Sequence, residues 1–237
     1  MIGDVDLYAF CDFLAHVQQV LIGIDRDGTL LKDTGRYPGS EGPSEVFELC
    51  EGAIDCVKLL NQIPNSAVAI ISNQSGLAQG RLGIKDVERV NNTVKKLLEL
   101  GRASIQGIYF CEHVSLDYAR TKGISLSNSF VKECSDMKPN PGMLFRACKE
   151  LLRTPPEKCN IYMIGDRSDD VLSGLSAGGK SVFVKSSVHQ SDTLEIKKKM
   201  QIHYDKIHNA KDLIGAAEWI IMDVARSCAK EISAKDL

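Results

Sequence analysis

The segment Val20-Leu21-Ile22-Gly23-Ile24-Asp25-Arg26-Asp27-Gly28-Thr29-Leu30 decides the fold of this chain. It begins with a short apolar run of the kind that forms a buried strand. The run leads into two carboxylates, Asp25 and Asp27, and Gly28 lets the chain turn tightly after them. If the strand belongs to an open parallel sheet, these acids lie at the edge where such sheets bind ligands.

The rest of the chain alternates short apolar runs with longer amphipathic stretches. We expect further strands at 67–72, 107–111, 160–165 and 180–185. Apolar residues at helical spacing predict helices at 52–63, 84–100, 141–152, 169–177 and 210–225. Strands that alternate with helices are typical of a parallel sheet covered on both faces. The sequence therefore predicts an α/β fold, a Rossmann-like three-layer sandwich with about five parallel strands.

Three stretches show no regular pattern, namely 31–46, 112–137 and 186–205. Long loops within a compact domain are usually functional or mobile. The stretch 1–19 predicts a helical N-terminal extension. No shift in composition marks a boundary after it, so we expect residues 20–237 to form a single domain.

The composition is that of an ordinary globular protein, with 43% hydrophobic residues and a formal net charge of -2 over 237 residues. This balance gives no sign of a nucleic-acid-coating surface or a polybasic membrane anchor. The longest apolar runs are far shorter than the roughly 20 residues of a membrane span. The first residues also lack the basic start of a secretory signal. We expect a cytoplasmic protein without nucleic-acid or membrane partners; its oligomeric state is open, with a monomer favoured.

Polar side chains gather where the predicted strands end. In chain order they are Asp25 and Asp27, then Ser72 and Asn73, then Cys111 and His113, then Lys138, and finally Asp166, Asp169 and Asp170. In an open parallel sheet, ligands bind beyond the carboxyl ends of the strands. A lone Asp-x-Asp pair is usually a solvated loop or a helix cap. The whole set, in this order, indicates one site.

These residue types suit phosphate chemistry. Asp25 and Asp166 can ligate one magnesium ion if their strands are neighbours, because magnesium prefers hard oxygen ligands. A carboxylate at position 25 can attack phosphorus and form an aspartyl-phosphate. Asp27 can protonate the leaving oxygen and later activate water, and its backbone carbonyl can add a metal ligand. Ser72 can hydrogen-bond the phosphoryl oxygens, and Lys138 can stabilise the charge of the transition state.

At these positions the sequence resembles the haloacid dehalogenase (HAD) superfamily of phosphotransferases. Four segments carry the resemblance: Asp25-Arg26-Asp27-Gly28-Thr29-Leu30, Ser72-Asn73-Gln74-Ser75-Gly76, Lys138-Pro139 and Gly165-Asp166-Arg167-Ser168-Asp169-Asp170. The resemblance implies a nucleophile at Asp25, a general acid/base at Asp27, and phosphate binding by Ser72, Asn73 and Lys138. It also implies magnesium ligation by Asp25, Asp27 and Asp166. Asp170 fits the second acidic position of the last motif better than Asp169 does and would stand behind the metal.

Finer details are similar to the branch that contains heptose bisphosphate phosphatase and histidinol-phosphate phosphatase. They are Asn73-Gln74-Ser75-Gly76-Leu77-Ala78 and Lys138-Pro139-Asn140-Pro141-Gly142-Met143-Leu144. That branch lacks a large cap domain, and the gaps between the motifs have no room for one here. The absence of a large cap is therefore part of the predicted HAD-like fold.

The same branch often carries a structural zinc, bound by Cys-x-His and a later Cys-x-Cys. The matching residues here are Cys111, His113, Cys134 and Asp136. Zinc accepts carboxylate oxygen, although structural sites prefer cysteine and histidine. We expect a zinc site with Asp136 as the fourth ligand. The alternative is a metal-free loop with buried thiols.

Two further departures concern the substrate. Met137 stands where the branch usually has an arginine that helps to bind the substrate, and Gln79 interrupts its usual Ala-Arg-Gly run. A strongly anionic substrate would lose a bidentate partner. Basic residues of the 112–137 loop could replace that charge, although a solvated loop is the simpler interpretation; they are Arg120, Lys122 and Lys132.

Taken together, the residues predict a magnesium-dependent phosphomonoester hydrolase that forms an aspartyl-phosphate. Its substrate would be a small phosphorylated metabolite, such as a sugar phosphate, a heptose bisphosphate-like compound or a histidinol phosphate-like compound. Two alternatives stay open. One is a binding or regulatory protein that keeps the fold without turnover. The other is a nucleic-acid end phosphatase, which the near-neutral charge disfavours.

Overall fold

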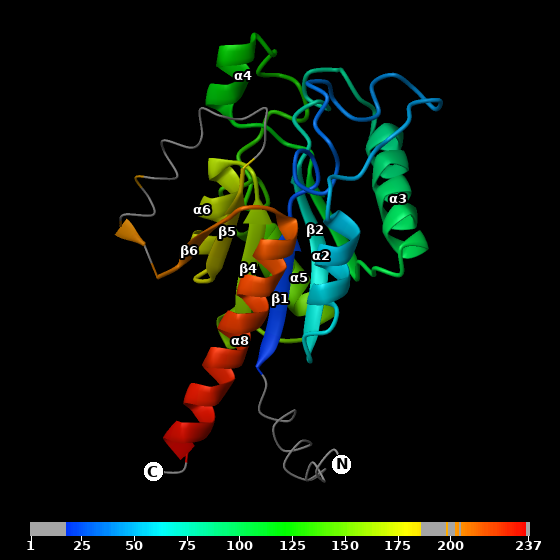
Figure 1. Ribbon diagram of the computed structural model, residues 1–237. Helices are drawn as coiled ribbons and strands as arrows, with labels where there is room; N and C mark the ends of the chain where they lie inside the picture. The colour runs from blue at the N-terminus through cyan, green and yellow to red at the C-terminus, as the bar shows by residue number, and fades with distance from the viewer. Residues whose placement is uncertain (1–17, 186–197, 199–201, 204, 236–237) are drawn as a thin grey trace.

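A computed structural model describes residues 18–185, 198, 202–203 and 205–235. The predicted N-terminal extension and most of the 186–205 stretch lie outside the described residues. The secondary structure follows the predicted alternation of strands and helices (Figure 1). None of the described helices is long and apolar enough to cross a membrane.

The sheet has six parallel strands in the order β3-β2-β1-β4-β5-β6. The strands are β1 (Gln19–Ile24), β2 (Ser66–Asn73), β3 (Gly107–Cys111), β4 (Cys159–Gly165), β5 (Lys180–Val184) and β6 (Ile207–Ala210). The sequence predicted about five strands and missed one of the six. The missed strand, β6, has only four residues and pairs with a single neighbour, so it leaves too short a pattern in the sequence.

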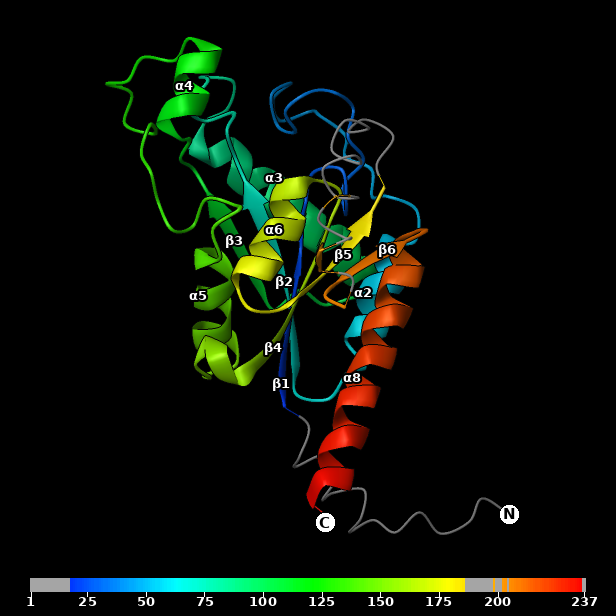
Figure 2. The same ribbon diagram turned by 90° about the vertical axis from the view of Figure 1, so that its left-hand side faces the viewer.

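Helices cover both faces of the sheet, as Figure 2 shows. One face carries α2 (Ala53–Leu60), α3 (Ile84–Leu100) and α8 (Leu213–Lys235), and the other carries α5 (Gly142–Leu151) and α6 (Ser168–Ser176). The central strand β1 sends alternate side chains to opposite faces. Val20 and Ile22 join the core under α2 and α8, whereas Leu21 joins the core under α5. The predicted three-layer sandwich is confirmed.

The expectation that 112–137 is irregular throughout was wrong, because it contains the short helix α4 (Leu116–Lys122). Ser115 caps its first turn by accepting a hydrogen bond from the Tyr118 N–H at 3.0 Å. Gly123 ends it in the left-handed conformation, with φ 65°. These two caps are visible in the sequence and could have revealed the helix. The helix and its loops lie above the carboxyl ends of the strands (Figure 1).

The strand order places the functional segments together. The chain leaves β1 towards β2 and β3 on one side, and β4 later pairs with the other side of β1. Crevices form at such a switch point, just beyond the carboxyl ends of the two strands. Asp25 follows β1 and Asp166 follows β4, so the condition for a shared metal ion, neighbouring strands, is met.

Close packing beneath the site depends on Gly23 in β1. A Cβ atom at this position would lie 2.7 Å from Cδ2 of Leu144, a distance that real Cβ atoms do not show. The absence of a side chain therefore lets α5 approach the central strand closely. Leu144 fills the space over Gly23 and is 1% exposed.

We expect Leu144→Ala to lower the free energy of unfolding by about 2–5 kcal/mol, because it opens a cavity in a packed core. Urea unfolding at constant pH measures this loss. Leu100→Ala is the matched control, since Leu100 ends α3 with 82% of its surface exposed. Equal losses for the two variants would contradict the packing described for α5.

Candidate active site

A cavity of about 350 Å³ opens at the carboxyl edge of the sheet. Its lining includes most of the residues predicted from the sequence, namely Asp25, Asp27, Ser72, Asn73, Lys138 and Asp170. They come from the turn after β1, from β2, from the loop before α5 and from the start of α6. The fold thus brings together residues that are more than a hundred positions apart.

The ammonium group of Lys138 lies at the centre of this site. Its Nζ donates to Oδ1 of Asp25 at 2.6 Å, to Oδ1 of Asp170 at 2.5 Å and to the Ile71 carbonyl at 2.8 Å. Burial alone would lower the pKa of Lys138, but the two carboxylates outweigh it and raise that pKa. The lysine therefore stays charged where a phosphoryl group would carry negative charge.

Three buried carboxylates lie close together here, and two of them, Asp25 and Asp170, contact this ammonium group. The side chains of Asp25, Asp166 and Asp170 offer ligand oxygens that all lie within 4.8 Å of one another. Burial raises the pKa of Asp25 to about 8; Asp170, Asp166 and Asp27 add to the rise, and Lys138 opposes it. Hard oxygen donors packed this closely form the set that a magnesium ion prefers. The donor set therefore fits magnesium, with Asp166 and Asp25 placed as the sequence predicted.

Gly28 makes room for the carboxylate of Asp166. Its φ of +95° is favourable only for glycine, and a Cβ atom there would lie 2.6 Å from Oδ2 of Asp166. The next residue, Thr29, donates from its hydroxyl to Oδ1 of Asp166 at 3.4 Å. The turn after β1 therefore needs glycine for two reasons, its backbone conformation and the close approach of β4.

Asp27 also faces the cavity, but its carboxylate is engaged from behind. Arg26 donates to it from Nε at 2.7 Å and from Nη2 at 2.8 Å, and Gln74 donates at 3.0 Å. Burial tends to raise the pKa of Asp27, but the charge and hydrogen bonds of Arg26 dominate and lower it. Sequence reasoning missed both Arg26 and Gln74, because their partners follow only from the fold.

The two predicted phosphate-binding residues after β2 differ in their surroundings. Ser72 is buried at the cavity wall, where its Oγ accepts a hydrogen bond from Gln74 at 2.8 Å. The Asn73 side chain instead binds the backbone of Lys138, donating to its carbonyl and accepting from its N–H, both at 3.0 Å. In this arrangement the Asn73 amide holds the loop that carries Lys138 in place.

The residues that depart from the branch lie around the rim. The Gln79 amide donates to the Tyr118 hydroxyl at 2.8 Å and to the Tyr37 hydroxyl, which ties the 31–46 loop to α4. Met137 packs against the core under α5 and does not line the cavity.

Arg120 pairs with Asp117 on the outer side of α4 at 3.0 Å, and Lys122 and Lys132 are exposed. None of these three basic residues lines the cavity. The cations that do line it, besides Lys138, are Arg36, which pairs with Glu41, and Arg167.

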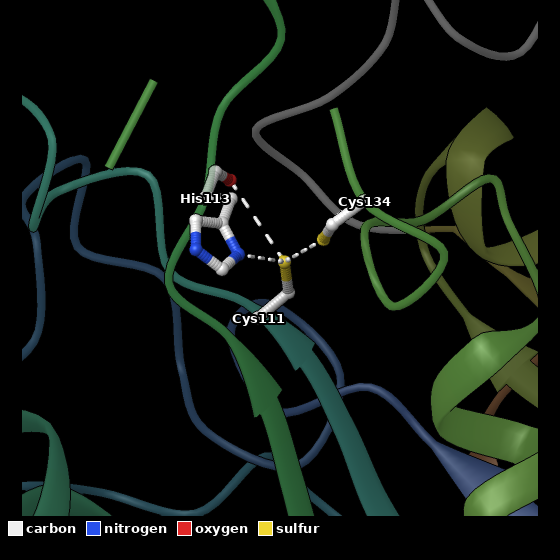
Figure 3. A group of neighbouring side chains, drawn as sticks. All are labelled: Cys111, His113 and Cys134. Atoms are coloured by element: carbon white, nitrogen blue, oxygen red, sulfur yellow. Dashed lines mark hydrogen bonds between the residues drawn. The ribbon is translucent and has the colours of Figure 1, made fainter. Parts of the chain in front are cut away.

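A second cluster lies at the end of β3, where Figure 3 shows Cys111, His113 and Cys134 facing one another. Their ligand atoms lie within 4.8 Å, with the two sulfur atoms 3.3 Å apart and Sγ of Cys111 3.9 Å from Nδ1 of His113. Burial raises the pKa of Cys111 to about 12. Asp136 lies beside this group without belonging to it, and its carboxylate accepts a hydrogen bond from Arg146 at 2.6 Å. The structure therefore assembles three of the four expected zinc ligands.

Comparison with known proteins decides the family. The HAD-hydrolase-like family model matches residues 137–210. The chain is 30% identical over 166 residues to D-glycero-beta-D-manno-heptose-1,7-bisphosphate 7-phosphatase of Pasteurella multocida, covering 70% of this chain and 81% of that protein. The chain belongs to the HAD superfamily of phosphatases.

Other relatives agree with this assignment. The D-glycero-D-manno-heptose-1,7-bisphosphate 7-phosphatase of Chlorobaculum tepidum is 29% identical over 202 residues, covering 84% of this chain and 92% of that protein. The crystal structure of D,D-heptose 1,7-bisphosphate phosphatase from B. bronchiseptica, complexed with magnesium and phosphate, superposes with a TM-score of 0.64 at 18% identity. It covers 86% of this chain and 99% of that structure, and shows that the two proteins share the HAD fold.

We expect magnesium to stabilise this HAD protein through Asp166. At a magnesium concentration 100-fold above its dissociation constant, binding adds about 2.7 kcal/mol to the free energy of unfolding. The rise in Tm measures this effect, and it should vanish in Asp166→Asn. Asp169→Asn is the matched control, since Asp169 is exposed and stands outside the three-carboxylate group. A full magnesium shift in Asp166→Asn would contradict this assignment.

Proposed function

We propose that this HAD phosphatase hydrolyses a small phosphorylated sugar in a magnesium-dependent reaction that passes through an aspartyl-phosphate at Asp25. The observation that carries the proposal is the buried group of Asp25, Asp166 and Asp170, two of which accept hydrogen bonds from the Lys138 ammonium. This arrangement combines a nucleophilic carboxylate, a cation for the phosphoryl charge and a donor set for a metal ion.

In the proposed reaction, an Asp25 oxygen forms a bond to phosphorus while the bond to the leaving oxygen breaks. The leaving oxygen takes its proton from Asp27, which lines the same cavity. Water then attacks phosphorus, gives a proton back to Asp27 and releases Asp25 and inorganic phosphate. Lys138 and the Ser72 hydroxyl stabilise the phosphoryl oxygens during both steps.

Asp25, Asp166 and the backbone carbonyl of Asp27 would hold the magnesium ion, with Asp170 supporting them through Lys138. When bound, the ion polarises the phosphoryl group and neutralises part of its charge. The buried carboxylates at this edge of the sheet supply the negative charge that attracts it.

The sugar phosphate assignment draws on the relatives, whose names give heptose bisphosphates as their substrates. The rim of this chain supports a hydroxyl-bearing leaving group, since Tyr37 and Tyr118 line the cavity with neutral hydrogen-bonding groups. These features favour a sugar over histidinol phosphate. The near-neutral charge disfavours nucleic-acid ends, and the filled catalytic positions disfavour a silent binding protein. A cytoplasmic location and a monomeric state stay predictions.

Asp25→Asn tests the proposed chemistry. We expect phosphate release from sugar phosphates, assayed with magnesium, to fall by at least about 10³-fold, because the amide is a poor nucleophile. The wild type should also acquire an acid-stable, base-labile phosphoryl group in rapid-quench experiments, and the variant should not. Asp33→Asn is the control, because Asp33 lines the same cavity but lies outside the three-carboxylate group. Turnover that survives Asp25→Asn would overturn the covalent mechanism.

We further propose that Cys111, His113 and Cys134 bind a structural zinc ion. Their clustering supports this proposal, and Asp136 would have to exchange its ion pair with Arg146 to become the fourth ligand. Such a site would fasten the loop that leads to Lys138 onto the end of β3.

Metal analysis of the purified protein should then find about one zinc per chain, and Cys134→Ser should lose most of it because a thiolate ligand is gone. Cys159→Ser is the matched control, since Cys159 is a half-buried free thiol in β4, outside the cluster. A zinc-free wild-type protein purified without chelators would show the alternative, a metal-free loop.

A further inference from the structure

Arg26 is a fully buried charged residue directly beneath the active site. Its side chain is 0% exposed, so it cannot touch a substrate, and it does not line the cavity. A buried charge is costly unless it is paired and hydrogen-bonded. Arg26 meets this condition with four hydrogen bonds to side chains, so its contacts indicate what it does.

Two of these bonds form a fork on Asp27. Nε donates to Oδ1 at 2.7 Å and Nη2 donates to Oδ2 at 2.8 Å. Such bidentate pairs fix the plane and position of a carboxylate as well as its charge. The Asp27 side chain keeps 23% of its surface exposed and lines the cavity. The guanidinium therefore clamps Asp27 from behind while its other side faces the substrate space.

Gln74 connects this pair to the phosphate-binding side of the cavity. Its Oε1 accepts from Nη2 of Arg26 at 2.9 Å, and its Nε2 donates to Oδ2 of Asp27 at 3.0 Å and to Oγ of Ser72 at 2.8 Å. With an acceptor and two donors all in use, the amide has only one favourable orientation. Asp27 and Ser72 are thus held in a fixed relation to each other.

Asn91 anchors the guanidinium from the helical layer. It lies on α3, is 5% exposed, and accepts from Nη1 of Arg26 at 2.6 Å through its Oδ1. A buried asparagine lowers stability unless its polar atoms are hydrogen-bonded. The network therefore runs from α3 through Arg26 to the carboxylate beside the nucleophile.

We propose that Arg26, held in turn by Asn91 and Gln74, is a positioning residue that fixes the Asp27 carboxylate for proton transfer to the leaving oxygen. The inference rests on the proposed acid/base role of Asp27. A small displacement of a proton donor costs much of its contribution, because proton transfer needs hydrogen-bond reach. Lysine cannot replace arginine here, since it lacks the planar fork.

The leaving group separates this role from a merely structural one. An alkyl phosphate expels a strongly basic alkoxide and needs a proton from Asp27. An aryl phosphate such as p-nitrophenyl phosphate expels a stable phenolate and needs almost none. General acid catalysis typically contributes about 10²–10⁴-fold, so a misplaced Asp27 should affect the alkyl substrate selectively. General loss of structure would slow both substrates alike.

The experiment measures kcat/KM for a sugar phosphate and for p-nitrophenyl phosphate, both with saturating magnesium. This quantity reports the steps up to the first irreversible one, and so leaves out hydrolysis of the aspartyl-phosphate. For Arg26→Lys we expect a loss of about 100-fold on the sugar phosphate and less than about 5-fold on the aryl phosphate. Asn91→Ala should show the same selectivity with a smaller loss, and it keeps the test possible if the arginine variant does not fold.

Asn92→Ala is the matched control, because Asn92 is the exposed neighbour of Asn91 on α3. It should leave both values near those of the wild type. Asp27→Asn separates the two levels of the argument. If Asp27→Asn is selective but Arg26→Lys and Asn91→Ala slow both substrates equally, the positioning role is wrong and the acid role stands. If Asp27→Asn itself slows both substrates equally, the proposed acid role fails, and the positioning role fails with it.

Discussion

The site depends on the hydrogen bonds of the Lys138 ammonium group, because they join segments that approach one another only in the folded chain. It joins Asp25 after β1, Asp170 at the start of α6 and the Ile71 carbonyl of β2. Three carboxylates buried so closely would repel one another without a compensating cation. A lysine at this point lets the fold keep the acidic cluster that would hold a divalent ion in the proposed reaction.

A second buried cation, Arg26, has a different set of hydrogen-bond partners from Lys138. Lys138 contacts Asp25 and Asp170, whereas Arg26 contacts Asp27. The pKa values of the two carboxylates in the Asp-x-Asp motif therefore shift in opposite directions. Burial and neighbouring acids raise the pKa of Asp25, whereas the arginine fork lowers that of Asp27. One turn of chain thus delivers two acids of the same chemical type into different environments.

The residues that depart from the resembled branch lie outside the base of the site. Gln79 joins two tyrosines from separate loops, and Met137 packs into the core at a position where an arginine was expected from the resemblance. Asp136 pairs with Arg146 near the cysteine cluster. These three residues are not among the hydrogen-bond partners of the Lys138 and Arg26 side chains.

The sequence by itself determined the layered α/β fold and the order in which Asp25, Ser72, Lys138 and Asp166 reach one edge of the sheet. It could do so because strand and helix periodicity is local, and because parallel strands end at the same edge. Only the tertiary structure decided the partners of the charges. Arg26 hydrogen-bonds with Asn91, 65 residues away in the sequence, and the Asn73 side chain hydrogen-bonds with the Lys138 backbone. The short edge strand β6 likewise follows from pairing with β5. These side-chain and strand partners depend on distances between elements that are far apart in the sequence. Local sequence patterns do not predict those distances.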